Sequence, residues 1–134
     1  MSVLSSVRTL VEKLVLVHTA HPDRDLNRIE RTARHYYDLH ELLGRQDVLD
    51  EIEPHGIDAL ARDILTYSIA AALPAAPRPP GGFANSPAFT TGSDTLDRAR
   101  NAYNQIIDQF LWPGTPRPTF NACLERVHAT AHTL

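Results

Sequence analysis

The spacing of apolar residues along the chain predicts helices over most of its length. In residues 5–21, intervals of three and four residues separate Val7, Leu10, Val11, Leu14 and Val17, which places them on one face of a helix that ends before Pro22. The same spacing recurs in residues 24–38, 57–73, 93–111 and 119–131. No stretch alternates apolar and polar residues as a half-buried strand does. The pattern predicts an all-α fold, a bundle of about five helices, in which the helix over residues 57–73 is the most buried.

Two segments interrupt this helical pattern. Residues 47–53 carry acidic residues around Val48, Leu49 and Ile52, and they fit either a short helix or an extended surface loop. Residues 74–92 are rich in proline and glycine, which excludes a continuous helix and favours extended backbone facing solvent. We expect Phe83 and Phe89 to attach that loop to the body of the protein. The chain is therefore predicted to be one domain over residues 1–134, with the loop at 74–92 between helices at 1–73 and helices at 93–134.

One predicted helix face is unusually cationic. If residues 24–38 form a single helix at about 100° per residue, one arc of roughly 80° contains Arg24, Arg28, Arg31, His35 and Asp38. A guanidinium group binds phosphate through two parallel donors, so a row of such groups suits a phosphate-bearing ligand. The same pattern also fits a solvated face with intrahelical ion pairs, such as Glu30 with Arg34.

Composition and charge limit the classes of protein to consider. The chain has 13 Lys and Arg against 16 Asp and Glu, a net charge of −3, so any contact with nucleic acid must be local. Cys123 is the only cysteine, which excludes an internal disulfide. No apolar run approaches the roughly 20 residues of a membrane span, and the N-terminus lacks a signal-peptide pattern. We expect a cytoplasmic protein without a membrane segment.

Isolated candidate residues are less specific. Lys13 is the only lysine, and it borders the apolar face of the first helix, where a lysine stem commonly covers apolar surface while its ammonium group stays in water. Two histidine pairs, His18 with His21 and His128 with His132, have spacings compatible with a metal site on one helix face. No further residues complete a zinc pattern around either pair, so we assign no metal ligand.

Two motifs resemble a known family. The Glu12-Lys13 pair within residues 3–14 and the run Arg34-His35-Tyr36-Tyr37-Asp38-Leu39 resemble the middle and later part of the AbiEii/AbiGii-type nucleotidyltransferase toxins, which include the MenT-type toxins. Residues 102–110 and 116–124 resemble the ending of that family. The resemblance covers nearly the whole chain, and the Glu-Lys and Arg-His-Tyr-Tyr-Asp segments are its specific parts.

The resemblance implies a function. In that family the Lys and the Asp of these motifs count among the active-site residues, which assigns catalytic roles to Lys13 and Asp38 and implies that both face one site. Phosphate-binding candidates are then Arg28, Arg31, Arg34 and His35. The implied reaction transfers a nucleotide from a nucleoside triphosphate to an RNA acceptor such as tRNA, with magnesium as cofactor and an antitoxin as partner.

The metal-binding part of the family pattern is not matched. Family members carry a mixed α/β core before the Glu-Lys motif, with a Gly-Ser-type motif and an Asp-x-Asp motif that holds magnesium. Asp23-Arg24-Asp25 matches that motif only in its letters, at a helix entry where acids act as caps. The chain thus resembles the C-terminal helical part of such an enzyme. We expect a truncated or split nucleotidyltransferase that is inactive alone and that self-associates or pairs with the missing N-terminal half. The alternative is a non-catalytic helical module that binds a protein or RNA through Arg24, Arg28 and Arg31.

Overall fold

The computed structural model describes residues 3–21, 26–111 and 113–134. Within those ranges the chain forms seven α-helices, two short 3-10 helices and no strand. The predicted all-α class is therefore confirmed. The structure has two helices more than expected, because one predicted helix is divided and the acidic segment around residues 47–53 is helical.

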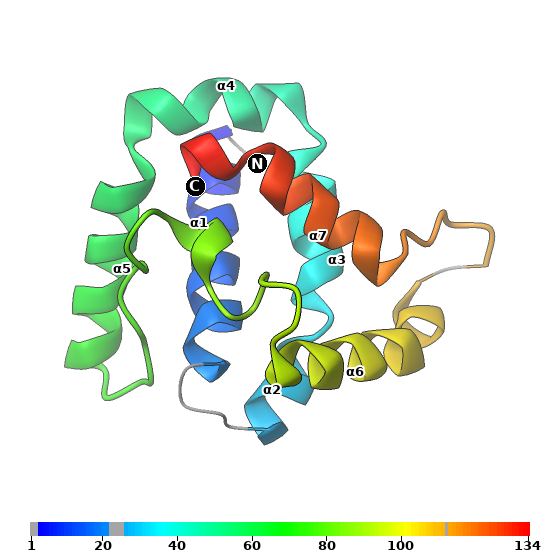
Figure 1. The fold of residues 1–134 in the computed structure, drawn as a ribbon. Helices are drawn as coiled ribbons and strands as arrows, with labels where there is room; N and C mark the ends of the chain where they lie inside the picture. The colour runs from blue at the N-terminus through cyan, green and yellow to red at the C-terminus, as the bar shows by residue number, and fades with distance from the viewer. Residues whose placement is uncertain (1–2, 22–25, 112) are drawn as a thin grey trace.

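The bundle is built around α1 (Val3–Ala20). Figure 1 shows α4 (Gln46–His55) across one end of α1, with α5 (Ile57–Ala70) and α3 (His35–Leu43) on either side of it. These three helices and α2 (Leu26–Thr32) all contact α1. The predicted apolar face is completely buried at Val7, Leu10, Val11, Leu14 and Val17. Because burying one such side chain contributes about 1.5–3 kcal/mol, α1 supplies much of the stability of the core.

The prediction of a single helix over residues 24–38 is wrong. Helix α2 ends at Thr32 and α3 begins at His35, with Ala33 and Arg34 in a turn between them. At this division the amide of Tyr36 donates to the carbonyl of Ala33, a three-residue spacing that tightens the backbone. The turn changes the direction of the chain, so that His35, expected on the exposed cationic face, is only 7% exposed.

The two helices after α3 differ from expectation in different ways. Helix α4 settles the structure of the acidic segment, and it buries Val48 and Ile52. Helix α5 is not the most buried helix, because it packs mainly on α1 and α4 and most residues of its C-terminal half are exposed. Ile69 is 66% exposed and Leu73, which follows the helix, is 53% exposed. The apolar repeat over residues 57–73 therefore marks a helix with a partly open apolar face.

The last two α-helices close the other side of the bundle. Helix α6 (Asp94–Phe110) packs on α2, and α7 (Phe120–Ala129) packs on α3. Thr119 is the N-cap of α7, as its side-chain oxygen accepts a hydrogen bond from the amide of Ala122 at 3.1 Å. Of the helices described, none is both long and apolar enough to cross a membrane.

The Pro/Gly-rich segment is packed more tightly than its composition suggests. In Figure 1 it runs up beside α5 and then down toward α6, with the 3-10 helix η1 (Phe83–Asn85) in its course. Phe83 and Phe89 are completely buried, which confirms their expected role as anchors, and the expectation that residues 74–92 face solvent fails around them. Gly82 has φ +108°, and a Cβ there would lie 2.9 Å from the carbonyl carbon of Leu134. Only glycine fits this position without strain.

Candidate functional site

The structure brings Lys13 and Asp38 into contact. Lys13 lies on α1 and Asp38 on α3, two helices that pack directly against each other. The ammonium nitrogen Nζ of Lys13 is 3.3 Å from Oδ2 of Asp38. Both side chains remain partly accessible, at 26% for Lys13 and 35% for Asp38. The pair therefore sits at the surface of the packed core, where a ligand can reach it.

His35 is the third member of this cluster. Its Nδ1 atom is 3.1 Å from Oδ2 of Asp38 and 3.3 Å from Nζ of Lys13. The His35 side chain is only 9% exposed. Its packing comes from the turn before α3, which directs the first residue of that helix inward. We call Lys13, His35 and Asp38 the Lys-His-Asp cluster.

The cluster keeps its carboxyl group ionised. Burial by itself raises the pKa of Asp38, but the hydrogen bond from His35 and the charge of Lys13 together outweigh that effect, so the pKa lies below its ordinary value. Asp38 is therefore a carboxylate at neutral pH. A carboxylate with a lowered pKa is a poor proton acceptor and a good partner for a cation.

The predicted arginine residues do not join the cluster as one continuous face. Arg31 and Arg34 are exposed, and neither forms an ion pair within the described part of the chain. Arg28 is half-buried and already has an interaction of its own. Arg24 lies outside the described residues. The arginines and the cluster do not form one face because the turn between α2 and α3 separates the arginines of α2 from the inward-facing residues of α3.

A cavity of about 470 Å³ lies elsewhere, between α1 and α5. Arg28 lines it, together with apolar residues that include Leu16, Tyr67 and Leu73, whereas Lys13, His35 and Asp38 do not. Three of the exposed large apolar side chains, Leu16, Tyr67 and Leu73, thus gather around one groove. The expectation that the chain self-associates stays a prediction.

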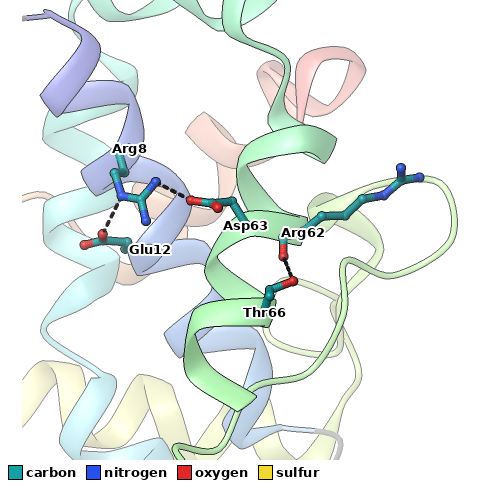
Figure 2. Close-up of polar contacts among 5 residues, drawn as sticks. All are labelled: Arg8, Glu12, Arg62, Asp63 and Thr66. Carbon is teal, nitrogen blue, oxygen red and sulfur yellow. Dashed lines mark hydrogen bonds and ion pairs between the residues drawn. The ribbon is translucent and has the colours of Figure 1, made fainter. Parts of the chain in front are cut away.

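Arg8 joins the two helices that border this cavity. Its Nη1 donates to Oδ2 of Asp63 on α5 at 2.8 Å, and its Nε is 3.3 Å from Oε1 of Glu12 on α1. Figure 2 shows Arg8 between these two carboxylates, with the Arg62 side chain extending away from them. All three partners are well exposed, so water screens the pairs and their net contribution to stability is small. Glu12 thus pairs with Arg8 at the edge of the cavity, whereas Lys13, the next residue in the sequence, belongs to the Lys-His-Asp cluster.

The histidine pair at the end of α1 is engaged in hydrogen bonds to the Pro/Gly-rich segment and to α6. Nδ1 of His18 contacts Oγ of Ser86, and Nδ1 of His21 contacts Oγ1 of Thr95 at 2.9 Å. Each ring is therefore held by a hydroxyl group from a distant part of the chain. No group of three His, Cys, Asp or Glu side chains suited to a metal ion occurs among the described residues.

Lys13 and Asp38, predicted to face one site, lie 3.3 Å apart, and their catalytic roles stay a prediction. His35 differs from expectation in its exposure. We predicted His35 as an exposed phosphate-binding residue, and the structure places it beneath the Lys13–Asp38 contact. One feature of the sequence indicated that His35 contacts Asp38. His35 and Asp38 are separated by three positions, a spacing that brings two side chains together on one helix face.

Comparison with known proteins gives one result. No curated protein and no solved structure matches the chain. A family model described as nucleotidyl transferase AbiEii toxin, type IV toxin–antitoxin system, matches residues 1–126. This match includes α1 and α3, and with them the whole Lys-His-Asp cluster. The chain belongs to the AbiEii family of nucleotidyl transferase toxins.

Proposed function

We propose that the Lys-His-Asp cluster is the phosphate-contacting part of a nucleotidyltransferase site that acts on a nucleoside triphosphate and an RNA acceptor. The observation that carries the proposal is the 3.3 Å contact between Lys13 and Asp38, the two residues to which the resemblance of the sequence motifs assigns active-site roles. They come from different helices and meet where both are accessible. An antitoxin is the expected protein partner, since the family is that of toxin–antitoxin systems.

The chemistry of the transfer assigns a role to Lys13. An acceptor hydroxyl oxygen attacks the α-phosphorus of the triphosphate, the bond to the bridging oxygen of the β-phosphate breaks, and pyrophosphate leaves with the added negative charge. An ammonium group carries three donors and no acceptor. Asp38 takes one of these donors, which leaves donors on Lys13 for oxygens of the triphosphate. Lys13 would thus neutralise charge on the leaving phosphates.

Asp38 is better suited to hold Lys13 than to remove a proton. Its pKa lies below the ordinary value, despite burial, because His35 and Lys13 both stabilise the ionised form. A general base works best when its pKa is close to the working pH. We therefore propose that Asp38 orients the ammonium group of Lys13. A group other than Asp38 then removes the proton from the acceptor hydroxyl.

The described residues do not fit a magnesium site by themselves. Nucleotidyl transfer generally uses a divalent metal such as magnesium, which requires several oxygen ligands in octahedral geometry. The cluster offers one carboxylate, and the ammonium group of Lys13 is 3.3 Å from it, which opposes a second cation there. The Lys-His-Asp cluster therefore does not fit a magnesium ion.

The exposed arginine residues favour a second candidate function. Arg31 and Arg34 are exposed on and next to α2, and two guanidinium groups in that position suit an RNA backbone. A non-catalytic module would use these arginines and not the Lys-His-Asp cluster. Replacing both by glutamate is then expected to abolish RNA binding, whereas Lys13→Ala leaves it unchanged. If the cluster is a nucleotidyltransferase site, Lys13→Ala should instead weaken the binding of the nucleoside triphosphate.

Replacing Lys13 by alanine is expected to weaken nucleoside triphosphate binding about tenfold. A hydrogen bond to a charged group contributes about 1.5–3 kcal/mol, and 1.4 kcal/mol corresponds to a factor of ten in affinity. Titration calorimetry of the chain with each triphosphate measures the change. Arg62→Ala is the matched control, because it also removes one positive charge but from an exposed position on α5. Equal losses in the two variants would contradict a specific role for Lys13.

The expectation that the chain is inactive alone is tested separately. Purified chain is mixed with labelled nucleoside triphosphates, magnesium and tRNA, and incorporation into RNA is counted. We expect little or no transfer, because the single carboxylate of the cluster does not supply the oxygen ligands that magnesium requires. Robust transfer that is lost in Lys13→Ala would refute inactivity and retain the assignment of the site. Robust transfer that persists in Lys13→Ala would refute the site itself.

A further inference from the structure

His35 makes two contacts through one atom. Its Nδ1 faces Oδ2 of Asp38 at 3.1 Å and Nζ of Lys13 at 3.3 Å, while Lys13 and Asp38 are themselves 3.3 Å apart. The three atoms form a closed triangle. Because the His35 side chain is nearly buried and the other two are partly exposed, His35 forms the inner corner of the cluster.

The proton on the imidazole ring decides which of these contacts is attractive. An ammonium group can only donate and a carboxylate can only accept, whereas Nδ1 does one or the other according to whether it carries hydrogen. With hydrogen on Nδ1, His35 donates to Asp38, and Lys13 bonds only to Asp38. With hydrogen on Nε2, Nδ1 accepts from Lys13, and two of the three ammonium donors are then used within the cluster.

We propose that His35 is a positioning residue that carries its ring proton on Nδ1 and donates it to Asp38. Asp38 then holds the Lys13 ammonium group through a single hydrogen bond, and the other two donors of Lys13 point toward the phosphate oxygens of a bound nucleotide. The inference rests on the proposed function for its ligand, but its geometry does not depend on a ligand.

Two observations favour this arrangement over the other tautomer. The distance from Nδ1 to the carboxylate is the shorter of its two contacts, although a lysine nitrogen is free to approach on a flexible stem. With hydrogen on Nε2, by contrast, the unprotonated Nδ1 would face a carboxylate oxygen at 3.1 Å, and neither atom could donate to the other. A donor at Nδ1 accounts for both.

Nitrogen NMR tests the tautomer directly. The chain is labelled with ¹⁵N-histidine, and the ring nitrogens of His35 are assigned by their loss in His35→Leu. The spectrum is recorded at a pH of about 8, above the ordinary pKa of an imidazole. We expect Nδ1 to show the shift of a protonated ring nitrogen and Nε2 that of an unprotonated one. The opposite pattern would overturn the proposal.

Two substitutions separate positioning from packing. His35→Leu fills the same space without a donor, and His35→Asn keeps an amide donor near the place of Nδ1. We expect the titration midpoint of Asp38, followed by ¹³C NMR, to rise in His35→Leu and to return toward its original value in His35→Asn. Lys13 is the only lysine, so ¹⁵N-lysine labelling gives a single side-chain signal that should shift in the same two variants.

A third variant is the control. His40→Leu alters another histidine of α3 that contacts Glu41 and not the cluster, and it should leave the Asp38 titration unchanged. An Asp38 midpoint unaffected by His35→Leu would overturn the positioning role even if Lys13→Ala weakens nucleotide binding. Conversely, a midpoint that moves in a chain that binds no nucleotide would sustain the positioning role and reject the proposed function.

Discussion

Replacing Tyr36 by alanine is expected to lower the free energy of unfolding by about 3–5 kcal/mol, as large aromatic-to-alanine changes in cores do. Tyr36 is 1% exposed, and its ring packs on Phe120 with centroids 4.6 Å apart and on Phe89 with centroids 5.8 Å apart. Truncation leaves a cavity between α3, α7 and the Pro/Gly-rich segment. Because small domains have about 5–15 kcal/mol of stability in total, the loss should appear as a large fall in the urea midpoint.

The hydroxyl group of Tyr36 contributes separately from its ring. It donates to the carbonyl of Ala88 at 2.7 Å and lies 3.2 Å from Nε2 of His21. Tyr36→Phe keeps the ring but leaves these two groups without that partner, and a buried unpaired group costs about 1–3 kcal/mol. Tyr67→Phe is the control, since Tyr67 is 67% exposed, and its effect should stay within about 0.5 kcal/mol. A loss below about 1 kcal/mol in Tyr36→Ala would show that Tyr36 does not hold the loop to α3.

This packing links the loop to the candidate site. Tyr36 lies between His35 and Asp38 in the sequence of α3, and it points to the core while they meet Lys13. The contacts with Phe89 and Ala88 therefore support the side of α3 opposite to the cluster. The Pro/Gly-rich segment helps to fix the orientation of the helix that carries Asp38, although no residue of the segment belongs to the site.

Helix positions were largely predictable from the sequence because they depend on local periodicity. The face of α1 that contains Leu10 and Leu14 is buried as predicted, and so are the anchors Phe83 and Phe89. Local periodicity also gave Lys13 its place at the border of that face. Its contact with Asp38 was implied only by the family motifs, since nothing in the spacing relates two residues on different helices.

The division between α2 and α3 was not predictable in the same way. No glycine or proline marks it, and the residues around Ala33 suit a continuous helix. The structure ends α2 where Thr32 donates its hydroxyl to the carbonyl of Arg28 at 2.8 Å, a local bond that competes with helical geometry. Burial of Tyr36 on the far side of the turn then outweighs the small cost of breaking the helix. Tertiary packing of this kind leaves no local pattern.

The hydrogen-bond partners of the histidines at the end of α1 were also not predictable from the sequence, because they lie far away along the chain. His18 and His21 have a spacing that also suits a metal, but their partners Ser86 and Thr95 are 68 and 74 positions away. Only the folded chain reveals that both rings are used in hydrogen bonds. This arrangement has a consequence for stability at low pH, because a ring that accepts a hydrogen bond at Nδ1 cannot also carry a proton there.

His21 is in such a position. The carbonyl of Ala88 can only accept, so the Tyr36 hydroxyl donates to it, and Nε2 of His21 must then donate to the tyrosine oxygen. Its Nδ1 is left to accept from Thr95. Burial first, and then the neighbouring His18, lower the pKa of His21 from 6.5 to about 4. The folded chain therefore holds His21 neutral where the unfolded chain binds a proton.

We expect stability to fall as the pH is lowered from about 6.5 to 4, by about 3 kcal/mol from His21 alone. The pKa of His21 is lower in the folded chain than in the unfolded chain. Its contribution to the free energy of unfolding is therefore complete above about pH 6.5 and is lost as the pH falls toward 4. The lowered pKa of Asp38 acts in a separate window, because a carboxylate contribution is lost only below about pH 4.

Urea unfolding at several pH values measures the slope of the free energy of unfolding against pH. His21→Asn should be less stable at pH 7 but flatter between 6.5 and 4, whereas His132→Asn, at an exposed position, should keep the original slope. An unchanged slope in His21→Asn would exclude His21 as the source of acid sensitivity.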